Sequence, residues 1–159
     1  MKKYEEKLKF ISFPNNSDYL YTATCLPVNT PVSTGIIIVP PIGRERLRIY
    51  RELVILARAL AMHGYAVSRF DYRGEGESSG EFQNTDIKTR VEDISLIKKE
   101  LQENYKVDKI CLIGWHLGAL VALVASKNIK NEYMIFCDPV CTPSQYIKNM
   151  FRTNIVMQQ

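Results

Sequence analysis

The sequence has few of the residues and runs that mark several common protein classes. It contains only two histidines, His63 and His116, and its four cysteines follow no zinc-binding spacing. No run approaches the roughly 20 consecutive apolar residues that span a bilayer. The lysines of MKKYEEKLKF have no apolar stretch behind them. We therefore expect a cytoplasmic protein with no secretory signal, no membrane span and no metal site.

The charge and glycine patterns argue against nucleic acid and nucleotides as ligands. The formal net charge is +4, from 21 basic and 17 acidic side chains, and no basic run is interleaved with aromatic residues. In RGEGESSG, the glycines at Gly74, Gly76 and Gly80 are spaced one residue too wide for the dinucleotide fingerprint. No G-x-x-x-x-G-K-[ST] motif occurs. We expect no nucleic-acid partner and no cofactor.

What the sequence does have is a hydrophobic pattern that changes its period repeatedly. Its 159 residues suit one domain over 1–159. Strand-like runs lie at 7–13, 19–27, 34–41, 65–72, 109–115 and 132–139, and helical periodicity at 47–63, 86–104 and 116–127. The turn-forming PNNSD predicts that the first two strands pair antiparallel. The alternation predicts an α/β fold, a three-layer α/β/α sandwich around a mostly parallel sheet.

A further helix is predicted to begin near the end of the sequence. Thr142 and Gln145 have capping-box spacing, with Pro143 at the first helical position. An apolar stripe follows on Tyr146, Ile147, Met150 and Phe151. Such a stripe needs a covering surface.

The stretch LIGWHLGALVA, residues 112–122, combines the end of a predicted strand with the start of a predicted helix. Gly114 and Gly118 flank His116 and remove side chains that would collide in a sharp turn between the two elements. The free backbone N–H groups of the helix N-terminus then point at whatever binds there. The strand, the tight turn and the helix form the setting of a nucleophile elbow.

Three motifs in order resemble the α/β-hydrolase family, and within it the serine-aminopeptidase-like and lysophospholipase-like esterase branch. IIIVPPIGRE is similar to the family's strand and oxyanion loop, and RFDYRGEGESSG to its D-x-R-G-x-G-x-S-x-G run. LIGWHLGA resembles the elbow, normally G-x-S-x-G. The resemblance covers roughly residues 8–150 and implies hydrolysis of ester, thioester or amide bonds.

The resemblance also implies roles for individual residues. The backbone N–H of Ile42 would be one oxyanion donor, and that of Leu117, directly after the elbow residue, the other. Asp71 and Arg73 would organise the loop at the edge of the site. His116 stands where the family has its serine nucleophile.

Two departures from the family pattern bear on activity. Imidazole can attack acyl groups, but it is larger than a hydroxymethyl group and needs a base and an orienting partner. The family's acid and catalytic histidine follow the elbow. Here one predicted strand, 132–139, follows it, and the other histidine, His63, precedes it. We expect a sheet that lacks the family's last two strands and an incomplete Ser-His-Asp triad.

Other polar residues near these motifs are also candidates for a functional role. Asp138 is a candidate acid, because some family members carry the acid after this strand; alternatively it opens a turn before Pro139. Ser78 and Ser79 lie in a predicted loop with no nearby base, which argues against a nucleophilic role. The sequence has a cluster of four arginines: Arg44, Arg46, Arg48 and Arg51. This cluster would either attract an anionic acyl carrier or form a solvated helix face with Glu45 and Glu52.

Three functional hypotheses remain open from the sequence. The chain is a degenerate family member, a pseudoenzyme or binding module for a small acyl ligand. Alternatively, it is one subunit of a two-chain hydrolase whose partner supplies the acid and the histidine. Finally, it is an active hydrolase that uses His116. An unpaired sheet edge after 132–139 invites a homo-oligomer or a complementary subunit.

Overall fold

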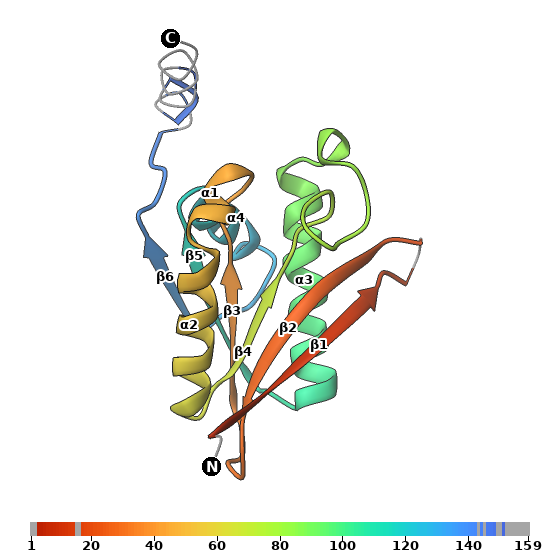
Figure 1. Ribbon diagram of the computed structural model, residues 1–159, viewed down its shortest axis with the longest axis vertical. Coiled ribbons are helices and arrows are strands. Elements are labelled where there is room, and N and C mark those ends of the chain that lie inside the picture. Colours follow the sequence, from red (N-terminus) through yellow and green to blue (C-terminus); the bar gives the residue numbers. More distant parts are fainter. Residues whose placement is uncertain (1–2, 15–16, 143, 145, 149–150, 152–159) are drawn as a thin grey trace.

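The computed structural model describes residues 3–14, 17–142, 144, 146–148 and 151. A single sheet runs through the centre of the molecule with helices on both sides (Figure 1). Its strands are β1 (Tyr4–Ser12), β2 (Tyr19–Pro27), β3 (Thr34–Val39), β4 (Ala66–Phe70), β5 (Lys109–Trp115) and β6 (Tyr133–Cys137). The α-helices are α1 (Arg44–Arg48), α2 (Tyr50–Met62), α3 (Ile87–Tyr105) and α4 (Leu117–Ala125), and a short 3-10 helix covers Phe82–Asn84.

The sheet is mixed, with its antiparallel part at one end. The strand order is β1-β2-β4-β3-β5-β6. β2 pairs antiparallel with both β1 and β4, whereas β4, β3, β5 and β6 run parallel to one another. The predicted antiparallel opening pair and mostly parallel sheet are confirmed. The carboxyl ends of β3 and β5, where a ligand site is expected in such sheets, are adjacent.

The two faces of the sheet bury separate cores. On β3, Ile36 and Ile38 face α2, whereas Ile37 and Val39 face α3 and α4. α2 contributes Leu53, Ala57 and Ala61 to its side, and the opposite core includes Val91, Ile94, Ile97, Leu101, Val121, Ala122 and Ala125. Alternation along a strand sends successive side chains to opposite faces. The predicted three-layer α/β/α sandwich is confirmed.

The predicted helix over 47–63 is wrong in one respect, because it is two helices. α1 ends at Arg48 and α2 begins at Tyr50, with Ile49 at φ −112°, ψ 12° between them. Ile49 packs against the core on the α2 side, and Arg46 turns inward. The far end follows the prediction, since Gly64 has φ +95° and donates to Ala61 while Tyr65 donates to Leu60, a Schellman cap.

The last predicted helix is described only in part. Tyr146 donates its backbone N–H to the carbonyl of Thr142 at 3.2 Å. Pro143, Gln145 and Met150 lie outside the described residues, and with them the predicted capping box and part of the apolar stripe. No helix in the described part of the chain is both long and apolar enough to cross a membrane.

Candidate active site

His116 forms the corner between β5 and α4. Its backbone has φ 53° and ψ −122°, the conformation that glycine usually takes at the first central position of a type II′ turn. Its N–H donates to the carbonyl of Cys137 on β6 at 2.9 Å, and its own carbonyl accepts from Ala119 at 3.1 Å. The corner is therefore held by both neighbouring elements.

Gly114 and Gly118 allow this corner to close. A Cβ on Gly114 would lie 2.5 Å from the Cα of Ala119. A Cβ on Gly118 would lie 2.2 Å from the carbonyl oxygen of Pro40 and 2.5 Å from that of Val39. Both contacts are with backbone, which cannot turn aside. The first turn of α4 thus packs directly on the loop that follows β3.

The imidazole of His116 is half-buried beside the residues that follow β6. Its Nδ1 atom is buried with no hydrogen-bond partner among the described residues. Its ring meets that of Tyr146 edge to face, with centroids 5.5 Å apart. Burial raises the pKa of Tyr146, and the charges of Glu45 and Glu75 raise it further. These acidic residues therefore lie in the same neighbourhood as the elbow.

The predicted oxyanion donors lie at adjacent positions in the fold. Ile42 is in the loop between β3 and α1, and Leu117 is the first residue of α4. The close approach of Gly118 to Pro40 brings these two segments together. Within the described ranges, neither the Ile42 N–H nor the Leu117 N–H donates a hydrogen bond. Their assignment as oxyanion donors stays a prediction.

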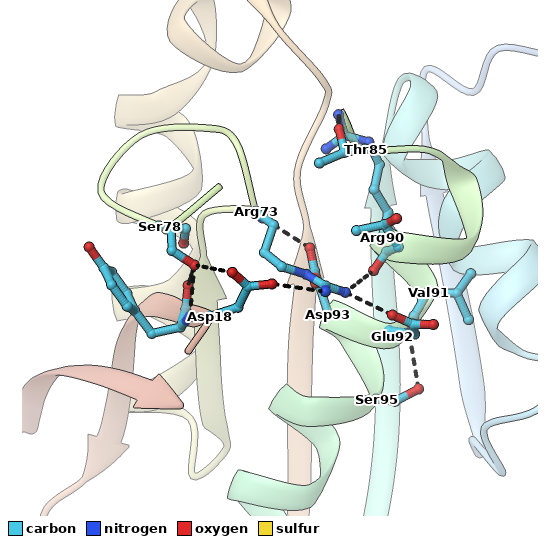
Figure 2. Close-up of polar contacts among 12 residues, drawn as sticks. Asp18, Arg73, Ser78, Thr85, Arg90, Val91, Glu92, Asp93 and Ser95 are labelled. Atoms are coloured by element: carbon cyan, nitrogen blue, oxygen red, sulfur yellow. Dashed lines mark hydrogen bonds and ion pairs between the residues drawn. The ribbon is translucent and has the colours of Figure 1, made fainter. Parts of the chain in front are cut away.

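Arg73 organises the loop that follows β4, and Figure 2 shows the acidic residues around it. Its Nε donates to Asp93 at 2.6 Å, and its Nη2 to Glu92 at 2.9 Å. Its Nη1 lies 3.5 Å from Asp18, and its guanidinium covers the ring of Phe13 at 4.2 Å. Arg73 therefore ties this loop to α3 and to the β1–β2 turn.

Asp93 is a buried acid that the sequence reasoning missed. Its side chain is 0% exposed, and it also accepts the backbone N–H of Arg73 at 3.0 Å. Burial raises its pKa, while the N–H and guanidinium of Arg73 oppose that shift. The available signal was its position, since Asp93 and Arg90 interrupt the apolar face of α3.

Asp71 pairs with Arg46, which corrects the prediction for the arginine cluster. The two side chains form a buried ion pair. Asp71 also accepts the N–H of Glu77 at 3.0 Å, and a Cβ on Gly76 would lie 2.0 Å from its Oδ2 atom. Arg46 is thus not on a solvated helix face; α1 turns it inward because Asp71 is the partner that satisfies its charge. Arg44, Arg48 and Arg51 are exposed.

The two serines of the glycine-rich loop hold it against β2. Ser78 Oγ donates to the Asp71 carbonyl at 2.6 Å and accepts the Tyr21 N–H at 2.9 Å. Ser79 Oγ accepts the Tyr19 N–H at 2.8 Å, and the Ser79 N–H donates back to the Tyr19 carbonyl at 3.1 Å. Both hydroxyls complete the hydrogen bonding of β2 next to its pairing with β4. Their role is structural.

Asp138 lies just beyond β6, at the same end of the sheet as His116. Its side chain is exposed and its backbone has φ +47°, a turn conformation. Val140, two residues on, donates its N–H to the His116 carbonyl at 3.4 Å. The described contacts include no hydrogen bond between the Asp138 carboxylate and the imidazole. Its role as the acid stays a prediction.

Outside the elbow, the structure has an open cleft of about 600 Å³ beside α3. Phe13, Arg73, Val91 and Lys99 are among the residues that line it. Every nitrogen of the Arg73 guanidinium already faces an acceptor or an acid.

Across the described residues, no three or more His, Cys, Asp or Glu side chains are grouped so as to hold a metal ion.

The elbow, the strand order and the loop organised by Asp71 and Arg73 together resemble a serine hydrolase. Residues 43–158 match the family described as serine aminopeptidase, S33. The chain belongs to the serine aminopeptidase S33 family. The resemblance to α/β-hydrolases drawn from the three motifs is confirmed, and with it the relation to serine hydrolases and esterases.

Solved structures of this fold give the same picture. The chain is similar to XC6422 of Xanthomonas campestris, an α/β serine hydrolase without a lid (TM-score 0.69, 25% identity, 83% of this chain and 60% of that one). It is also similar to the Pyrococcus furiosus esterase Pf2001 (TM-score 0.69, 25% identity, 86% and 50%). An α/β serine hydrolase homologue from Coxiella burnetii matches with a TM-score of 0.65 and 25% identity over 82% and 61%.

The chain spans between half and about three fifths of the length of these solved structures. Curated protein sequences gave no match. The family and the fold are thus established by the S33 match and by the solved structures.

Proposed function

We propose that this chain is a degenerate serine-hydrolase relative that binds the carbonyl group of a small acyl compound without hydrolysing it. The observation that carries the proposal is the state of the elbow. The backbone conformation of His116 and the close packing at Gly114 and Gly118 keep the nucleophile position. The side chain at that position has no hydroxyl, and its Nδ1 atom has no described partner. An imidazole with no base or hydrogen-bonded orienting group at Nδ1 is a poor nucleophile.

The binding half of the site supports this proposal. The Ile42 and Leu117 N–H groups donate to no described acceptor, and α4 directs its N-terminus toward the loop that holds Ile42. Two such donors suit the oxygen of an ester, thioester or amide carbonyl. The apolar ring of Tyr146 beside His116 suits the acyl chain. The chemistry predicted is therefore recognition of a neutral acyl group.

Hexanamide, a neutral acyl compound, provides the binding test. It is titrated into isotope-labelled protein while backbone amide resonances are followed by NMR. We expect saturable shifts at Ile42 and Leu117, with much smaller shifts at the remote helix end near His63. Shifts spread evenly over the surface, or none at Leu117, would contradict the proposal.

Turnover is tested separately with a panel of p-nitrophenyl esters and thioesters. Wild type and His116→Ala are both expected to show only the background rate. Wild-type activity that His116→Ala abolishes would overturn the proposal and make His116 the nucleophile. Activity that survives His116→Ala would place the chemistry elsewhere.

A second candidate function, one subunit of a two-chain hydrolase, rests on β6. This strand ends the sheet, and four of its large apolar side chains are 37–70% exposed: Tyr133, Met134, Ile135 and Phe136. Further strands would cover these side chains and could carry the missing acid and histidine. The test is the native mass of the protein with its co-purifying partners. A partner that gives the His116→Ser variant ester turnover would favour this function, and a lone chain would not.

A further inference from the structure

Glu75 is a buried carboxylate between the loop after β3 and the loop after β4. Its side chain is 7% exposed. Oε1 and Oε2 lie 3.4 and 3.3 Å from the backbone nitrogen of Gly43, which donates its N–H to them. On the other side, Arg90 Nη1 lies 3.2 Å from Oε1, within ion-pair distance though not in hydrogen-bond geometry. The carboxylate thus bridges α3 and the predicted oxyanion loop.

Arg90, the α3 residue that pairs with Glu75, is itself held in place by its neighbours. Its side chain is 4% exposed and its guanidinium covers the rings of Tyr72 at 4.7 Å and Phe82 at 5.5 Å. Its Nη2 donates to Thr85 Oγ1 at 3.2 Å, just before α3 begins. A guanidinium held by two rings and a hydroxyl has little freedom to move. Glu75 therefore links Gly43 to α3 through Arg90.

Gly43 has open space at the position where other residues carry a side chain. It has φ +66° and ψ −134°, and nothing lies within 4 Å of the position that a Cβ would take. Its carbonyl accepts from the Arg46 N–H at 3.1 Å as α1 begins. Its N–H is left to the Glu75 carboxylate, so this contact fixes the orientation of the peptide plane between Ile42 and Gly43.

Charged and titratable groups surround Glu75 from four segments. Arg46 faces it from α1, Arg90 from α3, Tyr72 from the segment after β4, and Tyr146 from the helical residues after β6. Burial raises the pKa of Glu75 above its ordinary value of 4.5, while Arg90, the Gly43 N–H and Arg46 oppose the shift. Tyr146 is also the residue that contacts the His116 ring. Glu75 is therefore part of the elbow's surroundings.

We propose that Glu75 is a positioning residue: its ionised carboxylate holds the Gly43 N–H and thereby restrains the loop that carries the neighbouring Ile42 N–H. The acceptor is a charged carboxylate, although at 3.3 and 3.4 Å the contact is longer than a typical charge-assisted hydrogen bond. This role deepens the proposed acyl recognition and rests on it only where the Ile42 donor meets a ligand. The contact between Glu75 and Gly43 stands independently of any ligand.

The test follows the Gly43 and Ile42 amide resonances by NMR between about pH 4 and pH 8, a range that covers an upward-shifted glutamate. In wild type, both amide protons are expected to titrate together with a midpoint above 4.5. In Glu75→Gln that transition disappears at both positions. Glu77→Gln is the matched control, because Glu77 lies in the same loop with an exposed side chain. It should leave the transition unchanged.

Hexanamide affinity at neutral pH gives the second readout, and the neutral probe avoids charge repulsion by Glu75. Glu75→Gln should raise the dissociation constant at least about threefold, and Glu77→Gln should not change it. A Gly43 amide that does not titrate in wild type, or titrates equally in Glu75→Gln, overturns the positioning role. Equal hexanamide affinity in wild type and Glu75→Gln overturns it also. A Gly43 transition that depends on Glu75, without hexanamide binding in any variant, supports the contact and defeats only the proposed function.

Discussion

At the scale of single residues, the decisive feature is a backbone conformation that its side chain does not favour. His116 is one of four non-glycine residues described with positive φ, together with Asn29, Lys106 and Asp138. Its ψ of −122° takes it outside the left-handed helical region where asparagine or aspartate is tolerated. Such residues persist only where the surroundings enforce them. Here the enforcing contacts are the hydrogen bonds to Cys137 and Ala119.

Replacing His116 with glycine should therefore stabilise the protein. Relief of the strained conformation is worth about 1–3 kcal/mol, and the greater freedom of glycine in the unfolded chain costs about 0.5–1 kcal/mol. We expect His116→Gly to raise the free energy of unfolding by about 1 kcal/mol, measured by urea denaturation. The control His63→Gly changes a residue at φ −98° and should stabilise nothing. A His116→Gly variant less stable than wild type would mean that the ring contact with Tyr146 outweighs the strain.

At the scale of elements, charge ties β1 to its neighbours. Glu6 accepts from Arg58 on α2 at 2.7 Å and from Arg69 on β4 at 2.8 Å. Burial by itself raises the pKa of Glu6, but the hydrogen bonds and charges of both arginines outweigh it, and the pKa lies below its ordinary value of 4.5. The stabilisation is therefore present above pH 4.5 and is lost as the pH falls through the lowered pKa.

Glu6→Gln is expected to lower the free energy of unfolding by about 1 kcal/mol at neutral pH. The difference from wild type should shrink as the pH falls below 4.5, because the wild-type carboxyl group then becomes protonated. Denaturation curves at several pH values measure it. Glu5→Gln is the matched control, since the one ion pair of Glu5 with a described residue is with Lys7 and its side chain is 53% exposed. A difference that stays constant down to low pH would contradict the ion-pair explanation.

Close packing defines the junction of β5, α4 and the loop after β3. Gly118→Ala would push a methyl group against two backbone carbonyls, so we expect a loss of about 3 kcal/mol of unfolding free energy. Gly43→Ala is a useful comparison because it has open space and only its φ of +66° to oppose it. It should cost about 1 kcal/mol. A loss in Gly118→Ala no larger than that in Gly43→Ala would contradict the expected clash with Pro40, because Gly118 lies in α4 and is not among the glycines with positive φ.

Elements with a clear period could be read from the sequence, and contacts between distant residues could not. The run over 34–41 and the helix over 86–104 were predicted because apolar spacing alone indicates them. The break at Ile49 was missed because the apolar positions continue across it, and its cause is the distant partner of Arg46 on the loop after β4. Ser78 and Glu75 lie in the D-x-R-G-x-G-x-S-x-G run, but their contacts with Tyr21 and Gly43 join segments that are distant in the sequence. The elbow could be recognised because both of its glycines lie within two residues of His116 in the sequence.

At the scale of the whole molecule, the two edges of the sheet differ. β1 carries Glu5, Lys7 and Lys9, charges that discourage pairing with another chain. β6 has the sequence YMIFC and carries no charge. Its side chains are exposed on both faces, so both layers of the sandwich are open at this end. Because an uncharged, exposed edge invites pairing, we expect any association with another chain or further strands to occur at β6.

A charge on β6 should weaken self-association. We expect wild type to associate as its concentration rises, and Ile135→Lys to shift sedimentation velocity profiles toward the monomer. Ile135 is 49% exposed, so the substitution should change stability little. Ile55→Lys is the matched control on α2, where the isoleucine is 56% exposed. If Ile135→Lys and Ile55→Lys both sediment as wild type does, the edge of β6 is not the site of association.

The central place of β3 determines which amide hydrogens report on the fold as a whole. β3 is paired with β4 on one side and β5 on the other, and both helical layers cover it. Its amides should exchange with solvent deuterium only when the entire sheet opens, whereas those of β1 and β6 exchange through local fraying. The amide hydrogens of β3, which ends at Val39, should therefore exchange more slowly than those of the sheet's edge strands. The loop that carries the predicted oxyanion donor Ile42 therefore follows the strand whose hydrogen bonds we expect to open last.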